Sequence, residues 1–89
     1  MIQHLNIKIY GQVQGVLFRS STENFATKLG ITGFIKNEPD ETVYIEAEGE
    51  MEDLNRILDW CKSGPQFAKV TKLEVTFGEL KNFSQFLIS

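Results

Sequence analysis

The chain has 89 residues, which predicts one domain over residues 1–89, and its net charge of −3 provides no overall basic surface for nucleic acid. Its single cysteine excludes an intrachain disulfide and a cysteine-based zinc site. No run reaches the roughly 20 apolar residues of a membrane span, and residues 1–4 lack the pattern of a signal peptide. We therefore expect a small, reduced, cytoplasmic globular protein that binds neither nucleic acid nor a membrane.

Hydrophobic periodicity predicts a strand and then a helix in the first third of the chain. Residues 5–10 alternate between apolar and polar side chains, as a half-buried strand does. The glycine-containing segment 11–15 interrupts this pattern, and apolar residues then recur at helical spacing. Ser20 and Glu23 resemble a capping box, although the helix can also begin one turn earlier, and Gly30 ends it.

The rest of the sequence predicts three or four more strands and a second helix. Residues 31–36 and 42–48 are expected as strands on either side of a turn. Gly49 is expected to cap a second helix, which Gly64-Pro65 ends. The expected inward face of that helix is Leu54, Ile57, Leu58 and Cys61. Residues 70–77 predict a strand with Leu73, Val75 and Phe77 on one face, and 83–88 predict a short final one.

The predicted order, βαββαβ with a possible terminal strand, favours an α/β (α+β) ferredoxin-like sandwich. In this fold two helices cover one face of an antiparallel sheet, and each βαβ unit crosses over with a right hand. The first and third strands then pair at the centre, and the second strand lies outside the third. The same order could be wound otherwise, and this architecture serves enzymes, metal carriers, RNA binders and ligand sensors. The site must therefore decide the function.

The segment between the first strand and the first helix carries the clearest chemical pattern. Gly11 and Gly15 allow a tight curl of the backbone that runs into a helix N-terminus, where free N–H groups favour an anion. Arg19 lies near the first helical turn, which electrostatics would reserve for negative charge. An anion held between Arg19 and the N–H groups explains this position, since a guanidinium can bind two phosphate oxygens. A plain turn beside a solvated arginine is the alternative.

The sequence offers this candidate site no nucleophile, general base or metal cluster. A cysteine-based phosphatase loop would need a thiolate at the position of Val13. Cys61 falls on an apolar helical stripe and is expected in the core, and His4 is expected on the surface. Such a site can hydrolyse only a phosphate with a good leaving group, by direct attack of water. Asn37 could orient that water, although it reads equally well as a turn asparagine, and the pattern does not place it beside Arg19.

Two stretches of this sequence resemble motifs of the acylphosphatase family. The residues Gly11-Gln12-Val13-Gln14-Gly15-Val16-Leu17-Phe18-Arg19 resemble the family signature, and Leu29–Asn37 resembles its second motif. The resemblance continues over nearly the whole chain, in Glu48-Gly49, Gly64-Pro65, Ala68–Val70 and Phe83–Phe86.

This resemblance implies an enzyme that hydrolyses the carboxyl–phosphate bond of acyl phosphates, giving a carboxylate and inorganic phosphate. By its family position, Arg19 would bind the phosphoryl oxygens and Asn37 would hold the attacking water. The phosphate-binding loop would comprise Gln14, Gly15, Val16, Leu17, Phe18 and Arg19. The substrate phosphate would accept the proton of the water. No metal or organic cofactor is implied, and we expect a monomer whose partners are a small acyl phosphate and inorganic phosphate.

Some residues depart from the family pattern. The turn after Asn37 reads Glu38–Glu41, without the glycine that is frequent there, and Phe34 replaces a frequent tryptophan. Loss of the glycine is expected to alter the turn, and Glu38 to add negative charge near the site. Two alternative functions remain at this point: a non-catalytic module that binds small anions, and a carbamoyl-phosphate-processing domain cut from a hydrogenase maturation factor.

Overall fold

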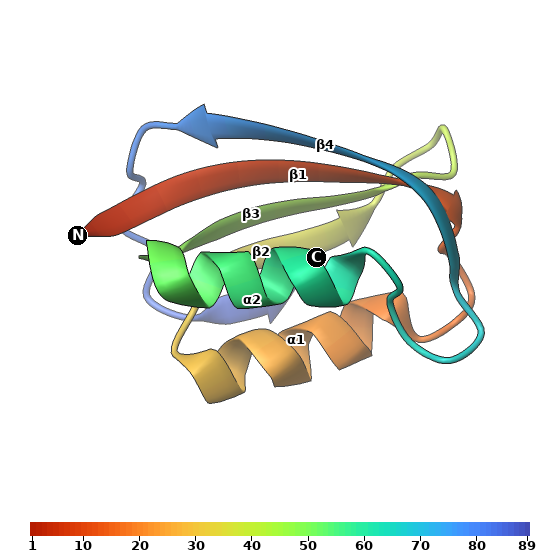
Figure 1. Cartoon of the computed structure of the whole chain (residues 1–89), viewed down its shortest axis with the longest axis horizontal. Coiled ribbons are helices and arrows are strands. Elements are labelled where there is room, and N and C mark those ends of the chain that lie inside the picture. The colour runs from red at the N-terminus through yellow and green to blue at the C-terminus, as the bar shows by residue number, and fades with distance from the viewer.

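Two helices pack on one face of a five-stranded sheet in the computed structural model, which describes residues 1–89 (Figure 1). The elements are β1 (Ile2–Gln12), α1 (Phe18–Leu29), β2 (Thr32–Asn37), β3 (Val43–Glu50), α2 (Met51–Cys61), β4 (Lys69–Gly78) and β5 (Phe86–Ile88). The strand order is β4-β1-β3-β2-β5. The ferredoxin-like prediction is therefore confirmed, with one correction: β5 runs parallel to β2, so the sheet is mixed rather than antiparallel throughout.

The hydrophobic core lies between the sheet and the helices, as the alternation in the first strand predicts. β1 and β3 pair antiparallel at the centre, with Ile7 opposite Ile45, and both side chains are fully buried. From α2, Leu54, Ile57 and Cys61 are fully buried against this face, and Leu58 packs at its edge. The core contains 15 buried apolar residues, enough to hold the central strands in one register.

The start of α1 agrees with the alternative of a helix that begins one turn before the capping box, whereas the cap of α2 differs from the prediction. α1 begins at Phe18, and its N-cap is Leu17, whose φ of 65° is left-handed. Ser20 does not cap the helix; its hydroxyl instead donates a hydrogen bond to the Leu17 carbonyl. The N-cap of α2 is Glu50 rather than Gly49. The first helix thus begins before the predicted capping box, and its N-terminus has no side-chain cap.

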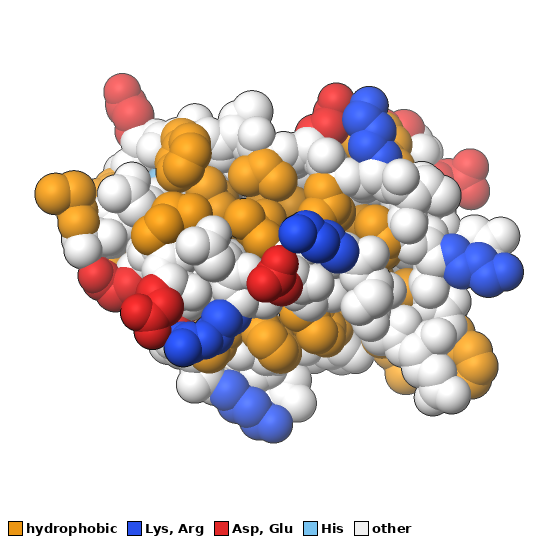
Figure 2. Space-filling model, in the orientation of Figure 1, with side chains coloured by type: hydrophobic (Ala, Val, Ile, Leu, Met, Phe, Trp, Pro, Cys, Tyr) orange, Lys and Arg blue, Asp and Glu red, His pale blue; other side chains and the backbone are white.

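The edge strand β4 is more exposed than its alternation suggests. Its register places Val75 opposite Ile7 and Phe77 opposite Leu5, on the helix-covered side of the sheet. The helices do not reach this edge, however, and Val75 and Phe77 are 41% and 66% exposed. Figure 2 shows the resulting apolar surface above α2, where β4 runs in Figure 1.

The other face of the sheet carries a polar cluster, in which His4, Glu46 and Glu48 are buried, Asn6 and Tyr44 are half-buried and Lys81 is exposed. The prediction that His4 is a surface residue is wrong, because its exposed fraction is only 2%. Its Nδ1 lies 2.7 Å from Glu48 Oε2, and its ring stacks on Phe83. The segment 79–85, which connects β4 to β5, crosses this face and covers it: the Lys81 N–H donates to Glu48 at 2.6 Å, and Lys81 Nζ lies 2.7 Å from Glu46 Oε1.

Candidate active site

Three residues with a positive φ, one at the end of β1 and two in the loop that follows, curl the chain before α1. Gly11, Gly15 and Leu17 have φ angles of 129°, 75° and 65°. A Cβ at Gly11 would lie 2.0 Å from the Lys69 carbonyl oxygen, so only glycine fits where the loop leaves the sheet. The non-glycine residue Leu17 takes its strained conformation at the last position before α1, a kind of outlier that is frequent at functional sites.

The curl leaves a run of backbone donors free. None of the N–H groups from Gln14 to Ser20 donates a hydrogen bond to another protein atom, and the first helical bond of α1 runs from the Ser21 N–H to the Leu17 carbonyl. Such N–H groups, together with the positive end of the helix dipole, form an anion-binding concavity. The loop that is predicted to bind phosphate therefore has free backbone N–H groups that can donate hydrogen bonds to an anion.

Arg19 adds a full positive charge at this helix start. The first turn of α1 contains no acidic residue, and the guanidinium forms no ion pair with any acidic side chain. Its one hydrogen bond to the protein is long: Nη1 donates to the Ser89 backbone oxygen at 3.5 Å. The charge is thus left available to an anion at a place where the helix dipole also favours one.

The fold brings Asn37 to the same pocket as Arg19, which the sequence pattern alone does not predict. Asn37 is the last residue of β2, a strand that lies between β3 and β5. A pocket of about 290 Å³ is lined by Val13, Gly15, Leu17, Phe18, Arg19, Ser20, Asn37 and Ile88. It contains the unpaired cation, the free donors of the loop and one side-chain amide, an arrangement that can hold a tetrahedral anion beside a positioned water.

Two predicted loop residues, Gln14 and Val16, do not line this pocket. The Gln14 side chain turns away, and its Nε2 donates at 2.9 Å both to the Glu38 carbonyl and to the Thr42 carbonyl. These bonds tie the loop to the turn that follows Asn37. The side chain of Gln14 is therefore a positioning group that sequence reasoning missed, and only the pairing of the two segments in space reveals it.

In the turn after Asn37, a non-glycine residue takes the strained conformation that the missing glycine would adopt. Glu41 takes a φ of 71°, a left-handed conformation that glycine adopts more easily. Hydrogen bonds from Thr42, and then the contact with Lys8, lower the pKa of Asp40 to about 2, so this carboxylate stays charged and holds the turn. Glu38 does not line the pocket; its Oε1 lies 3.9 Å from Lys36 Nζ. The negative charge expected from Glu38 is thus paired outside the pocket.

The other candidate groups lie away from the pocket. Cys61 is fully buried, as predicted, and burial raises the pKa of its thiol to about 12. His4 belongs to the polar cluster on the far face of the sheet. No group of three or more metal-ligating side chains is present. The pocket therefore contains neither a thiolate nor an imidazole that could act as nucleophile.

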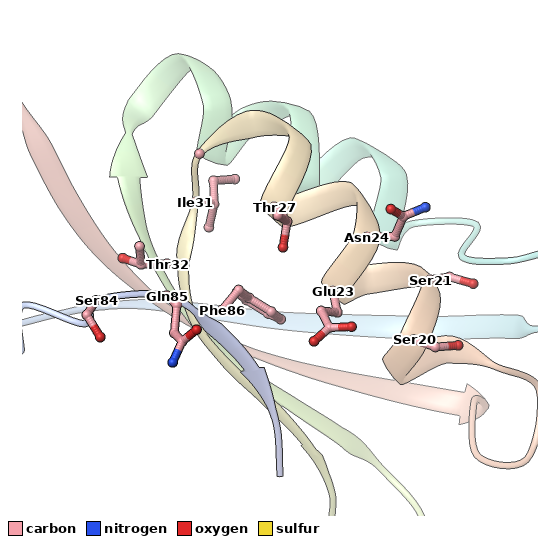
Figure 3. Close-up of a pocket in the computed structure, with 11 residues that line it drawn as sticks. Ser20, Ser21, Glu23, Asn24, Thr27, Ile31, Thr32, Ser84, Gln85 and Phe86 are labelled. Atoms are coloured by element: carbon pink, nitrogen blue, oxygen red, sulfur yellow. The ribbon is translucent and has the colours of Figure 1, made fainter.

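A larger, shallow groove of about 960 Å³ runs between α1 and β5 (Figure 3). Hydroxyl and amide side chains surround it, and its only charged residue is Glu23. A carboxylate without a cation repels phosphate. The smaller pocket beside Arg19, and not this groove, has the charge that anion binding needs.

Sequence comparisons relate the chain to acylphosphatases along most of its length. The profile of the Acylphosphatase family matches residues 5–88. The chain is 45% identical over 85 residues to an acylphosphatase of Archaeoglobus fulgidus, covering 96% of each chain. It is also 40% identical over 74 residues to an acylphosphatase of Methylococcus capsulatus, covering 83% of this chain and 80% of that protein. Neither α1 nor α2 has the length and apolar character that crossing a membrane requires.

Solved structures agree with these matches. The acylphosphatase of Bacillus subtilis superimposes with a TM-score of 0.94 at 37% identity, covering 100% of this chain and 99% of that one. Full-length HypF in a phosphate- and nucleotide-bound form gives the same TM-score of 0.94 at 33% identity, but the match covers only 12% of that chain. The fold, the motifs and the near full-length matches together show that this chain belongs to the acylphosphatase family.

Proposed function

We propose that the pocket beside Arg19 hydrolyses acyl phosphates to a carboxylate and inorganic phosphate. One observation carries this proposal: a single pocket joins the free N–H groups of the loop, an unpaired guanidinium and the Asn37 amide. The family membership supports the same reaction. The alternative of a domain cut from a hydrogenase maturation factor has less support, because the family profile and the relatives at 40% and 45% identity are acylphosphatases.

Binding of the phosphoryl group falls to the loop from Gln14 to Arg19. Its backbone N–H groups donate hydrogen bonds to the phosphoryl oxygens, and the Arg19 guanidinium binds two of these oxygens at once. The Gln14 side chain keeps the loop against the turn that follows Asn37. Because these donors are in place before the substrate arrives, they stabilise the charge of the transition state with little reorganisation.

Hydrolysis then needs only a positioned water. The Asn37 amide holds this water in line with the acyl oxygen, and the water oxygen attacks phosphorus. The bond between phosphorus and the acyl oxygen breaks, and the carboxylate leaves with its electron pair. A phosphoryl oxygen takes the proton of the water, so the products are a carboxylate and dihydrogen phosphate. A carboxylate is a good leaving group, which is why the reaction can proceed without a nucleophilic side chain or a general base.

We further propose that this one-domain chain acts as a monomer in the cytoplasm and without a metal. A single cysteine, buried in the core, suits a reducing compartment. The net charge of −3 argues against nucleic acid as a partner. Arg19 supplies the positive charge that a metal would otherwise bring to the phosphate.

The experiment that tests the proposed function is hydrolysis of benzoyl phosphate by the purified chain in the presence of EDTA, beside the Arg19→Ala variant. We expect turnover by the unsubstituted chain and none by the variant. Loss of activity on chelation would contradict the metal-free mechanism. Phosphate binding without turnover would favour the alternative of a non-catalytic module for small anions, and equal turnover by both proteins would place the chemistry elsewhere.

A further inference from the structure

Half of the residues that line the pocket beside Arg19 are apolar. These four of its eight lining residues are Val13, Leu17, Phe18 and Ile88. Val13 and Phe18 are buried in the core, whereas Leu17 and Ile88 are 76% and 40% exposed. A bound phosphate uses none of this apolar surface. Leu17 and Ile88 thus offer contacts to a part of the ligand that is not the phosphate.

Independent features of the backbone hold these two side chains at the pocket. Leu17 takes its left-handed conformation at the N-cap of α1, directly before Phe18 and Arg19. Ile88 comes from β5, which pairs in parallel with β2 and places Ile88 opposite Ile35. The next residue, Ser89, accepts the hydrogen bond from Arg19 Nη1 at 3.5 Å, so the end of β5 lies beside the guanidinium. Ile88 is therefore a direct neighbour of the anion site.

We propose that Leu17 and Ile88 form the subsite for the acyl group and select substrates with apolar acyl groups. This inference rests on the proposed function. The only cation that lines the pocket is Arg19, which the phosphoryl group occupies, so an acyl group with its own negative charge finds no partner there. An aromatic or branched aliphatic acyl group instead removes apolar surface of Leu17 and Ile88 from water.

The test compares kcat/KM for benzoyl, acetyl and succinyl phosphate, each corrected for its spontaneous rate of hydrolysis. The variant is Ile88→Ser, and the matched control is Leu87→Ser. Leu87 is 50% exposed and lies in the same strand, but it does not line the pocket. Thermal unfolding of both variants confirms that they fold. Leu17→Asn provides a second variant, because asparagine tolerates the left-handed conformation without offering apolar surface.

We expect the unsubstituted chain to prefer benzoyl over succinyl phosphate by about tenfold or more. Ile88→Ser and Leu17→Asn should each lower the benzoyl-to-acetyl ratio about threefold to tenfold, whereas Leu87→Ser should leave it within about twofold. Hydrolysis with a ratio that neither variant changes, or an equal fall with both substrates, would overturn the subsite and leave the proposed function intact. No hydrolysis of any of the three substrates would overturn the proposed function and the subsite together.

Discussion

The pocket beside Arg19 and the polar cluster on the opposite face of the sheet use their charges in opposite ways. In the cluster, each carboxylate has partners: Glu48 accepts from the His4 ring and from the N–H groups of Lys81 and Phe83. No buried side-chain polar atom of the molecule lacks a hydrogen bond. In the pocket, the guanidinium and a run of backbone donors are left open. Charges that satisfy one another stabilise the fold, while charges left open are available to a substrate.

The pKa values in the cluster show the same balance. Burial opposes ionisation of Glu48, but hydrogen bonds from the Lys81 N–H and the His4 ring outweigh it and lower the pKa of the carboxyl. Burial also raises the pKa of Tyr44 to about 12, helped by the hydrogen bond that its hydroxyl donates to Glu46. Glu48 therefore stays charged and Tyr44 stays neutral across the physiological range. The comparison predicts that substitutions in the pocket impair turnover and that substitutions in the cluster impair stability.

After Arg19→Ala, which should abolish turnover, the largest effect is expected from Asn37→Ala. This variant loses the amide that positions the water but keeps the phosphate-binding loop and Arg19. We therefore expect kcat to fall by about 10²–10³ while the Kd for inorganic phosphate changes little. Hydrolysis of benzoyl phosphate and phosphate titration measure the two quantities. Asn55→Ala, on the exposed side of α2, is the control. Turnover close to that of the unsubstituted chain would remove Asn37 from the mechanism.

Glu48→Ala should have the next largest effect, on stability rather than on turnover. The substitution leaves the His4 ring and two backbone N–H groups without their acceptor in a buried place, at a cost of about 3 kcal/mol in the free energy of unfolding. Urea denaturation measures this change. Glu52→Ala, at a side chain that is 79% exposed, should change stability by less than about 0.5 kcal/mol. If turnover per folded molecule also fell strongly, the two regions would not be independent.

Acid should reduce the stability that the polar cluster contributes before it affects phosphate binding by the loop and Arg19. Because the folded-state pKa of Glu48 and Glu46 is lowered from 4.5, the unfolded chain binds more protons below that pH. The carboxylates thus stabilise the fold fully above about pH 4.5, and this stability is lost as the pH falls through their folded-state values. Unfolding in urea between pH 6 and pH 3 measures the slope. Glu48→Gln should flatten it, whereas Arg19→Ala should leave it unchanged.

The smallest predicted effect concerns the strained turn after Asn37. The left-handed conformation of Glu41 costs an L-residue roughly 1 kcal/mol, and the greater flexibility of unfolded glycine offsets part of the gain. Glu41→Gly should therefore raise the free energy of unfolding by about 0.5 kcal/mol. Glu79→Gly, at a residue without a positive φ, should lower it. A loss of stability in Glu41→Gly would show that the Glu41 side chain stabilises the turn by contacts that outweigh its strain.

Much of the fold could be predicted from the sequence because the central strands alternate cleanly. The pattern of residues 5–10 and 42–48 fixes which side chains face the helices, and burial of Ile7 and Ile45 confirms it. The exposure of the edge strand β4 is not predictable in this way. Its apolar side chains do face the helical side, but alternation cannot tell how far two helices extend across a sheet, and Phe77 remains 66% exposed.

The site was predictable in part, for a similar reason. The glycine spacing and Arg19 point to an anion loop by local chemistry alone, but the contact of this loop with Asn37 depends on the order of strands in space. His4 was placed wrongly because nothing in its local sequence shows that segment 79–85 covers the far face of the sheet. A signal was available: Glu46 and Glu48 alternate outward on the central strand, and pairing of β1 with β3 sets His4 opposite Glu48.

The place of β1 in the sheet also has a consequence for synthesis of the chain. β1 is the first strand to be translated, yet its two neighbours are β3 and β4, and its register with β4 runs from Gln12 opposite Lys69 to His4 opposite Gly78. A ribosome must therefore release residue 78 before the centre of the sheet can close. Until then one edge of β1 has no neighbouring strand, and its unpaired backbone groups expose the nascent chain to edge-to-edge aggregation.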